Sequence, residues 1–200
     1  LVLGVLPGSR RGEVGRLLRP FGDTVRRLAV MHPGLRVIVP TVPTVAGLVR
    51  AAVADWPIET LVVPDLSQKY HAMAACDAAL AASGTVALEL GMAGIPMVIG
   101  YRLNTLTGLV IKRLVRVKYV CLINLLLDRA AVPEFLLSDS RAGLITPEVD
   151  KLLIDGAARN SQFDASAEAI DGLSAGTARP SDRAAQAVLD IIFKRETNNV

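Results

Sequence analysis

Aromatic residues and cysteines are scarce in this sequence, and each shortage excludes a class of protein. Phe, Tyr and Trp make up 4% of the 200 residues and do not interleave with a basic cluster, so we expect no binding of nucleic acid through base stacking. The two cysteines, Cys76 and Cys121, lie far apart in apolar sequence, which predicts reduced core thiols in a cytoplasmic protein rather than a disulfide framework or metal site.

Several signatures of nucleotide and metal chemistry are also missing. The sequence has neither a Gly-x-x-x-x-Gly-Lys-Ser/Thr run nor a Gly-x-Gly-x-x-Gly after its first apolar stretch, which argues against kinases and dehydrogenases. It has no Asp-x-Asp pair to hold a divalent cation against a diphosphate. Neither His32 nor His71 has a partner at metal-ligand spacing, and we interpret both as structural or solvent-facing. We therefore expect no metal and no cofactor.

Long apolar runs and a leader sequence are absent as well. No uninterrupted apolar run reaches the roughly 18 to 20 residues that a membrane span requires. The opening residues lack the basic region and cleavage pattern of a signal peptide. Because residues 1–6 already look like a strand, we interpret the chain as an excised domain or a truncation, with something missing upstream.

What the sequence does contain is a regular alternation of strand-like and helix-like segments. This pattern predicts an α/β fold, a Rossmann-like parallel sheet with helices on both faces and a helical C-terminal tail. The expected strands are 1–6, 35–39, 61–63, 76–81, 96–100 and 119–123. The expected helices are 14–31, 43–55, 67–75, one that opens at 83, 106–118 and three from 146 onward. Residues 1–145 would form the sheet domain, and the helices of 146–200 would pack on it.

A turn of small residues after the fourth expected strand carries a functional signal. Ser83, Gly84 and Thr85 would lie at the N-terminus of the following helix, where free N–H groups and the helix dipole favour a phosphate. The Glu89 carboxylate, one turn further on, could accept hydrogen bonds from two neighbouring hydroxyls, such as those of a ribose. On this segment alone, an ordinary strand, turn and helix explains the pattern equally well.

The loop after the first expected strand carries complementary chemistry. Gly8 permits close approach of a ligand, Ser9 offers a hydroxyl, and Arg10 offers a guanidinium that can fork onto phosphate oxygens. Ligands of open parallel sheets bind beyond the carboxyl ends of the strands, so several loops should share one crevice. These loops are 7–12, 64–66 and 82–85. The combination favours a nucleotide-sugar site over a purely structural role.

An ordered set of motifs extends from the first residues to about residue 140. Its segments are 6–14, 82–90, 94–98, 101–102, 113–115, 119–120, 124–125 and 132–136, with a looser match at 182–185. Together they resemble the lipid-A-disaccharide synthase family, GT-B glycosyltransferases with two Rossmann-like domains around a cleft. The resemblance implies that this chain is the C-terminal, donor-binding half, with residues 1–145 as the UDP-sugar-binding domain and the N-terminal acceptor domain absent.

The resemblance also implies a reaction and a set of residues. The family transfers 2,3-diacylglucosamine from its UDP carrier to a lipid monosaccharide 1-phosphate, 2,3-diacylglucosamine 1-phosphate, and releases UDP without a metal. Arg10 would stabilise the leaving group, and Asn124 would lie near the active cleft, although Ile123 stands where a proline is usual. The residues implied for UDP-sugar binding are Gly8, Ser9, Arg10, Leu66, Ser83, Gly84, Thr85 and Glu89. The general base would lie in the missing half, so this chain alone should bind donor without turnover.

The segment 106–118 is apolar and basic, and no acidic residue occurs between Glu89 and Asp128. It could lay an apolar face and a cationic rim on the anionic inner face of the cytoplasmic membrane, as in a peripheral protein. The basic residues expected to contact lipid are Lys112, Arg113, Arg116 and Lys118. A buried core helix with snorkelling basic residues is the structural alternative.

Two other functions stay open on the sequence alone. One is another GT-B UDP-sugar enzyme, such as a UDP-N-acetylglucosamine epimerase. The other is a non-catalytic membrane-surface or dimerisation module, which would bind lipid without binding UDP. A surface shaped to face an absent N-terminal half would also favour self-association into a homodimer.

Overall fold

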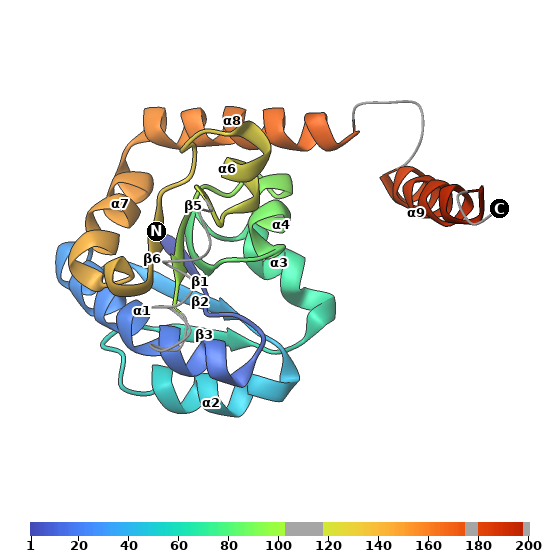
Figure 1. Cartoon of the computed structure of the whole chain (residues 1–200). Coiled ribbons are helices and arrows are strands. Elements are labelled where there is room, and N and C mark those ends of the chain that lie inside the picture. The colour runs from blue at the N-terminus through green and yellow to red at the C-terminus, as the bar shows by residue number, and fades with distance from the viewer. Residues whose placement is uncertain (103–117, 175–179, 198–200) are drawn as a thin grey trace.

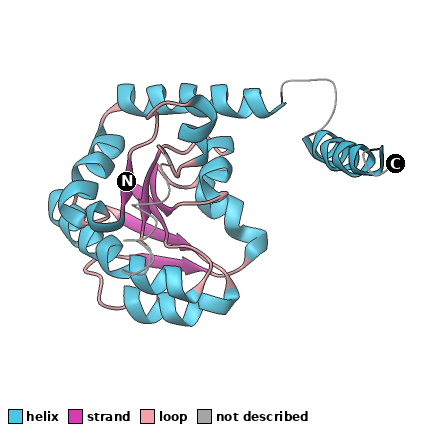
Figure 2. Cartoon of the chain, in the orientation of Figure 1, coloured by secondary structure: helices cyan, strands magenta, loops and turns pink. Residues whose placement is uncertain are grey.

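A six-stranded, all-parallel sheet forms the centre of the computed structural model, which describes residues 1–102, 118–174 and 180–197 (Figures 1 and 2). The strand order is β3-β2-β1-β4-β5-β6, and every neighbouring pair is parallel. The strands are β1 (Val2–Leu6), β2 (Arg36–Pro40), β3 (Thr60–Val63), β4 (Ala78–Ala82), β5 (Met97–Tyr101) and β6 (Glu134–Leu136). The predicted fold class is confirmed.

Helices cover both faces of this sheet and bury two separate apolar clusters. Successive residues of β4 alternate between the clusters: Leu80 belongs to the cluster on the first face, and Ala79 and Ala81 belong to the cluster on the second. On the first face lie α1 (Arg11–Met31), α2 (Pro43–Val53) and α7 (Ala142–Ile154). On the second lie α3 (Lys69–Ala74), α4 (Val86–Met92), α6 (Leu122–Leu127) and α8 (Gly156–Ser174).

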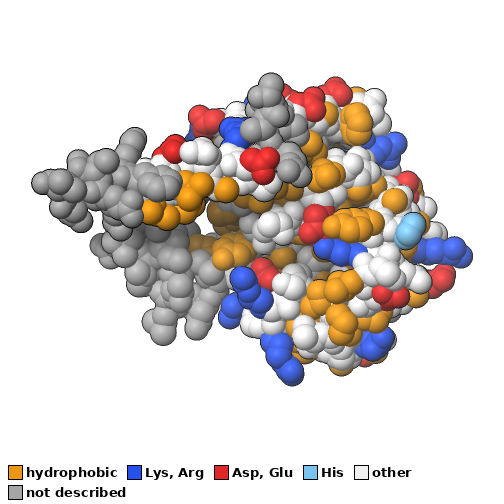
Figure 3. All heavy atoms as spheres, turned by 90° about the vertical axis from the view of Figure 1, so that its right-hand side faces the viewer, with side chains coloured by type: hydrophobic (Ala, Val, Ile, Leu, Met, Phe, Trp, Pro, Cys, Tyr) orange, Lys and Arg blue, Asp and Glu red, His pale blue; other side chains and the backbone are white. Residues whose placement is uncertain are grey.

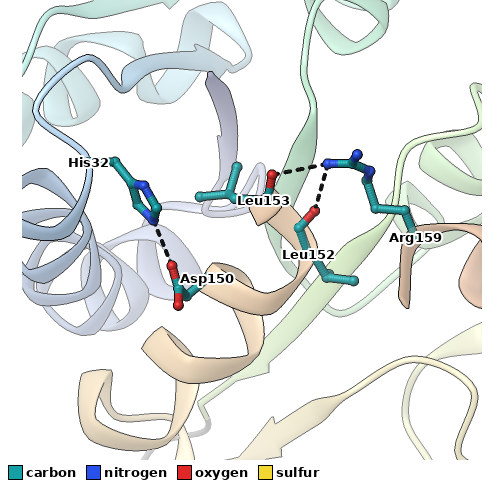
Figure 4. Close-up of polar contacts among 5 residues, drawn as sticks. All are labelled: His32, Asp150, Leu152, Leu153 and Arg159. Atoms are coloured by element: carbon teal, nitrogen blue, oxygen red, sulfur yellow. Dashed lines mark hydrogen bonds and ion pairs between the residues drawn. The ribbon is translucent and has the colours of Figure 1, made fainter. Parts of the chain in front are cut away.

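The long helix α1 follows the predicted apolar periodicity. The side chains expected on its apolar face are all buried: Val14, Leu17, Leu18, Phe21, Val25 and Leu28. At its C-terminal end, His32 Nε2 lies 2.6 Å from Asp150 Oδ1 of α7 (Figure 4). Close by, the Arg159 guanidinium donates to the carbonyls of Leu152 and Leu153, at 3.4 and 3.0 Å, in the last turn of α7. These polar contacts tie α1, α7 and α8 together, and they give His32 a structural role.

One predicted strand is wrong. Residues 119–121 form no strand, and Ile123 lies in α6, while the last strand of the sheet is β6. Side chains hold residues 120 and 121 instead of a strand ladder: Glu134 Oε2 accepts hydrogen bonds from the N–H groups of Val120 and Cys121, at 2.9 and 2.7 Å. A short apolar run does not distinguish strand from helix by its periodicity.

The remaining predicted helices have mixed outcomes. Three helices follow as expected near the C-terminus, α7, α8 and α9 (Pro180–Thr197), although α7 already begins at Ala142. In Figure 1, α9 lies to one side of the sheet and its covering helices. Most of the helix predicted at 106–118 lies outside the described residues.

Both cysteines are buried and free, in line with the prediction of core thiols. Burial, together with the negative charge of Asp77, raises the pKa of Cys76 to about 12. Burial also raises the pKa of Cys121. Because the thiolate is the reactive form, the raised pKa of each cysteine favours an inert, structural thiol.

Candidate functional site

A pocket opens at the carboxyl ends of β1, β2 and β4. Its volume is about 360 Å³. The lining residues are Leu6, Gly8, Ser9, Arg10, Glu13, Pro40, Thr41, Val42, Lys69, Ala82, Ser83, Gly84, Thr85, Val86 and Glu89. The structure therefore brings together the loops 7–12 and 82–85, as the carboxyl-edge rule predicts, and it adds the end of β2. The loop 64–66 is not part of this lining.

The first loop turns sharply into the N-terminus of α1. Gly8 has a φ of 107°, a conformation that favours glycine, and a Cβ there would lie 2.1 Å from Glu13 Oε2. The same oxygen accepts a hydrogen bond from the Ser9 N–H at 3.3 Å. Arg10 is the N-cap of α1, and its side chain is exposed. The Glu13 carboxylate thus lies at the N-terminus of α1, where the helix dipole favours negative charge.

The second loop, residues 82–85, lines the pocket and leads into α4. Gly84 has a φ of 147°, and a Cβ there would meet nothing within 4 Å, so the space in front of it is open. Thr85 is the N-cap of α4, a helix of only 7 residues, so the helix dipole is smaller than a long helix would supply. The Ser83 hydroxyl donates to the Val120 carbonyl at 2.9 Å. The Ser83 hydroxyl therefore holds a neighbouring segment in place, and its hydrogen is already used in that contact.

The far wall of the pocket contains an ion pair between two helices. Lys69 Nζ, at the start of α3, contacts Glu89 Oε2, in the first turn of α4. The side chains are 26% and 25% exposed, so the pair is partly shielded from solvent. Sequence reasoning found Glu89 and missed Lys69, since no motif surrounds the lysine and the contact depends on how α3 and α4 pack.

Thr41 is a second residue that sequence reasoning missed. It follows β2, is 5% exposed, and its Oγ1 has no hydrogen-bond partner among the described residues. A buried hydroxyl without a partner lowers stability, because it loses water and gains nothing in return. No signal in the sequence distinguishes this threonine from others at strand ends.

Replacing Thr41 with valine is expected to raise the free energy of unfolding by up to about 1 kcal/mol, since the valine removes the unpaired hydroxyl and keeps the shape. The matched control is Thr24→Val, because the Thr24 hydroxyl is buried but donates to the Pro20 carbonyl at 2.9 Å. That variant is expected to lose about 0.5–1 kcal/mol. Urea denaturation measures both. Equal destabilisation by the two substitutions would show that the Thr41 hydroxyl has a partner.

Two of the candidate residues, Leu66 and Lys118, lie away from this pocket. Leu66 begins a short 3₁₀ turn (Leu66–Gln68) and is 56% exposed, and its role at the uracil edge stays a prediction. Lys118 is exposed, and its Nζ lies 3.0 Å from Asp128 Oδ1. Lys112, Arg113 and Arg116 lie outside the described residues.

Asn124 is fully buried in α6, and backbone partners occupy its amide. Its Nδ2 donates to the Val132 carbonyl at 2.8 Å, and its Oδ1 accepts from the N–H groups of Ala131 and Val132, both at 2.8 Å. This geometry gives the side chain a role in holding the turn before β6. A direct catalytic role stays a prediction.

Charge is mixed on the face that Figure 3 turns toward the viewer. Basic side chains are scattered there among acidic and apolar ones, and the described side chains on this face gather into no patch of one sign.

The parallel sheet, its two helical layers and the carboxyl-edge pocket define a Rossmann-like domain of the GT-B kind. The fold is similar to the C-terminal domain of a glycosyl transferase group 1 family protein from Francisella tularensis, with a TM-score of 0.53, 14% identity and coverage of 85% of this chain and 84% of that one. The fold is also similar to that of UDP-GlcNAc 2-epimerase from Neisseria meningitidis bound to UDP-GlcNAc, with a TM-score of 0.53 and 15% identity. This match covers 88% of this chain and 45% of the epimerase chain. Such low identities show the fold alone.

The chain belongs to the lipid-A-disaccharide synthase family, because the family described as Lipid-A-disaccharide synthetase matches residues 1–188. The Lipid-A-disaccharide synthase of Rhodospirillum centenum is 48% identical over 194 residues, which cover 97% of this chain and 48% of the relative. The chain spans about half the length of the curated relatives that it matches. The family match also favours this membership over the epimerase alternative.

Proposed function

We propose that this domain binds the UDP part of a UDP-diacylglucosamine donor, as the donor-binding half of a lipid-A-disaccharide synthase. The family match supports the reaction, transfer of 2,3-diacylglucosamine to 2,3-diacylglucosamine 1-phosphate with release of UDP. The observation that carries the proposal is that two glycine-containing loops, an arginine and a carboxylate converge on one pocket.

The pocket offers different groups to the two ends of UDP. Arg10 and the N-terminus of α1 suit the diphosphate, which would replace the Glu13 carboxylate oxygen that now accepts from the Ser9 N–H. The Arg10 guanidinium lowers the barrier if its attraction grows as the departing UDP gains negative charge. The Glu89 carboxylate, about a quarter exposed, suits the ribose hydroxyls. The acceptor and the general base belong to the other half of the enzyme, so the isolated chain binds donor without turnover.

Contact with a membrane is part of the same proposal. Within the described part of the chain, no helix is long and apolar enough to cross a bilayer. The acid-free, basic segment 106–118 supports a peripheral position on the anionic inner face of the cytoplasmic membrane, where both lipid substrates would be found. Homodimer formation stays a prediction.

Calorimetric titration with UDP, with ADP as the control ligand, tests the donor site. We expect saturable UDP binding that weakens at least about tenfold in Arg10→Ala, because a hydrogen bond from a charged group contributes about 1.5–3 kcal/mol. The matched control is Arg19→Ala, which removes an exposed arginine of α1 that lies outside the pocket. Three results would contradict the proposal: no UDP binding by the folded chain, equal binding of ADP, or equal effects of the two substitutions.

A further inference from the structure

The ion pair between Lys69 and Glu89 is the feature of the pocket that the proposed reaction leaves unused. We propose that Lys69 is a positioning residue that holds the Glu89 carboxylate toward the vicinal hydroxyls of a ribose. The pair would thereby make this end of the pocket selective for a ribonucleoside diphosphate over its 2′-deoxy counterpart. This inference rests on the proposed UDP site.

The arrangement of the two side chains supports a positioning role. Lys69 Nζ contacts Glu89 Oε2, an oxygen that is shielded from solvent. The ammonium on this oxygen leaves the other, Oε1, as an acceptor for a ligand hydroxyl. The two residues come from different helices, and both line the pocket. The contact therefore fixes the direction of the carboxylate relative to the pocket, which Glu89 alone would not do.

Charge compensation is the second reason for the lysine. A diphosphate held at Ser9 and Arg10 would share the pocket with the Glu89 carboxylate, and the two like charges would repel each other. Partial burial strengthens this repulsion, since both Lys69 and Glu89 are only about a quarter exposed. Lys69 neutralises the carboxylate, so the pocket can accept hydrogen bonds from a ribose and still admit a dianionic ligand.

A competing role for Lys69 predicts a different pattern of binding. If its ammonium contacted the phosphates of the ligand, its loss would weaken pyrophosphate and UDP by the same factor. If it positions Glu89, its loss weakens UDP by a larger factor than pyrophosphate, because only UDP also loses a hydrogen bond from its ribose hydroxyls. The choice between these roles therefore needs ligands that differ in one part at a time.

The test is a set of titrations with UDP, 2′-deoxyuridine 5′-diphosphate and pyrophosphate. We expect the unaltered chain to bind UDP at least about fivefold more tightly than the deoxy ligand. The deoxy ligand lacks the 2′-hydroxyl and so loses one hydrogen bond to Glu89, which is worth about 1 kcal/mol. In Lys69→Met this ratio is expected to fall toward one, and pyrophosphate affinity is expected to weaken by a smaller factor than UDP affinity. Lys69→Arg is expected to keep part of the ratio, because the guanidinium can also hold a carboxylate.

The matched control is Lys151→Met, which removes an exposed lysine of α7 outside the pocket and is expected to leave every affinity unchanged. Thermal unfolding of each variant shows that it is folded. An unchanged ratio in Lys69→Met, or equal weakening of UDP and pyrophosphate, overturns the positioning role while the UDP site stands. Failure of the unaltered, folded chain to bind UDP overturns both proposals.

Discussion

Replacing Asn124 with leucine is expected to lower the free energy of unfolding by about 3–4 kcal/mol, since it removes hydrogen bonds from two buried backbone groups and one partly buried one, and each unpaired buried group costs about 1–3 kcal/mol. The groups are the N–H of Ala131 and both the N–H and the C=O of Val132. The leucine has nearly the same size, so the loss reflects polar groups rather than a cavity. Urea denaturation of the purified chain measures the change.

Asn124→Asp is the matched control. An aspartate keeps the oxygen that accepts from the two N–H groups, and in its protonated form its O–H can donate to the Val132 carbonyl. In acidic buffer, where the carboxyl is neutral, we therefore expect a smaller loss than that of the leucine variant. A leucine variant within about 1 kcal/mol of the unaltered chain would contradict the structural role. A large loss would mean that activity measurements on Asn124 variants report folding as well as chemistry.

Asn124 also belongs to a series of contacts that leads to the pocket. It fixes the turn before β6, and Glu134, the first residue of β6, accepts from the N–H groups of Val120 and Cys121. The Val120 carbonyl then accepts the hydrogen bond from Ser83, which lines the pocket. Side chains therefore connect α6 and β6 to the loop after β4. A residue in the position of Asn124 can influence the pocket through this series without touching a ligand.

The sequence predicted the sheet and its pocket because both follow from local patterns. The apolar spacing of α1 and the short apolar runs of the strands are local, and the carboxyl-edge rule then places the loops at Gly8 and Ser83 together. The direction of Glu89 depends instead on Lys69 from another helix, which no local pattern encodes. The path of residues 119–123 likewise depends on the hydrogen bond that Ser83 donates to Val120 and on the one that Glu134 accepts from it, and both partners are distant in sequence.

Close packing between α1 and β5 gives the second prediction. A Cβ at Gly100, in β5, would lie 2.6 Å from Phe21 Cε1 and 3.2 Å from Ser140 Oγ. Phe21 is fully buried, so its ring has no free space to move into. Gly100→Ala is expected to cost about 2–3 kcal/mol, and Gly100→Val more, because overpacking forces side chains off their rotamers or shifts the backbone. Urea denaturation measures the loss.

A glycine with open surroundings supplies the control for this prediction. Gly47 lies in α2, and a Cβ there would meet nothing within 4 Å, so Gly47→Ala is expected to raise the free energy of unfolding by about 0.5–1 kcal/mol through helix propensity. Combining Gly100→Ala with Phe21→Leu should cost less than the sum of the two single losses, because the smaller side chain makes room for the new methyl group. Strict additivity, or a Gly100→Ala variant as stable as Gly47→Ala, would show that α1 and β5 are not in close contact at this point. Opposite signs for the two glycine substitutions would instead identify the Phe21 contact as the reason for a glycine in the middle of β5.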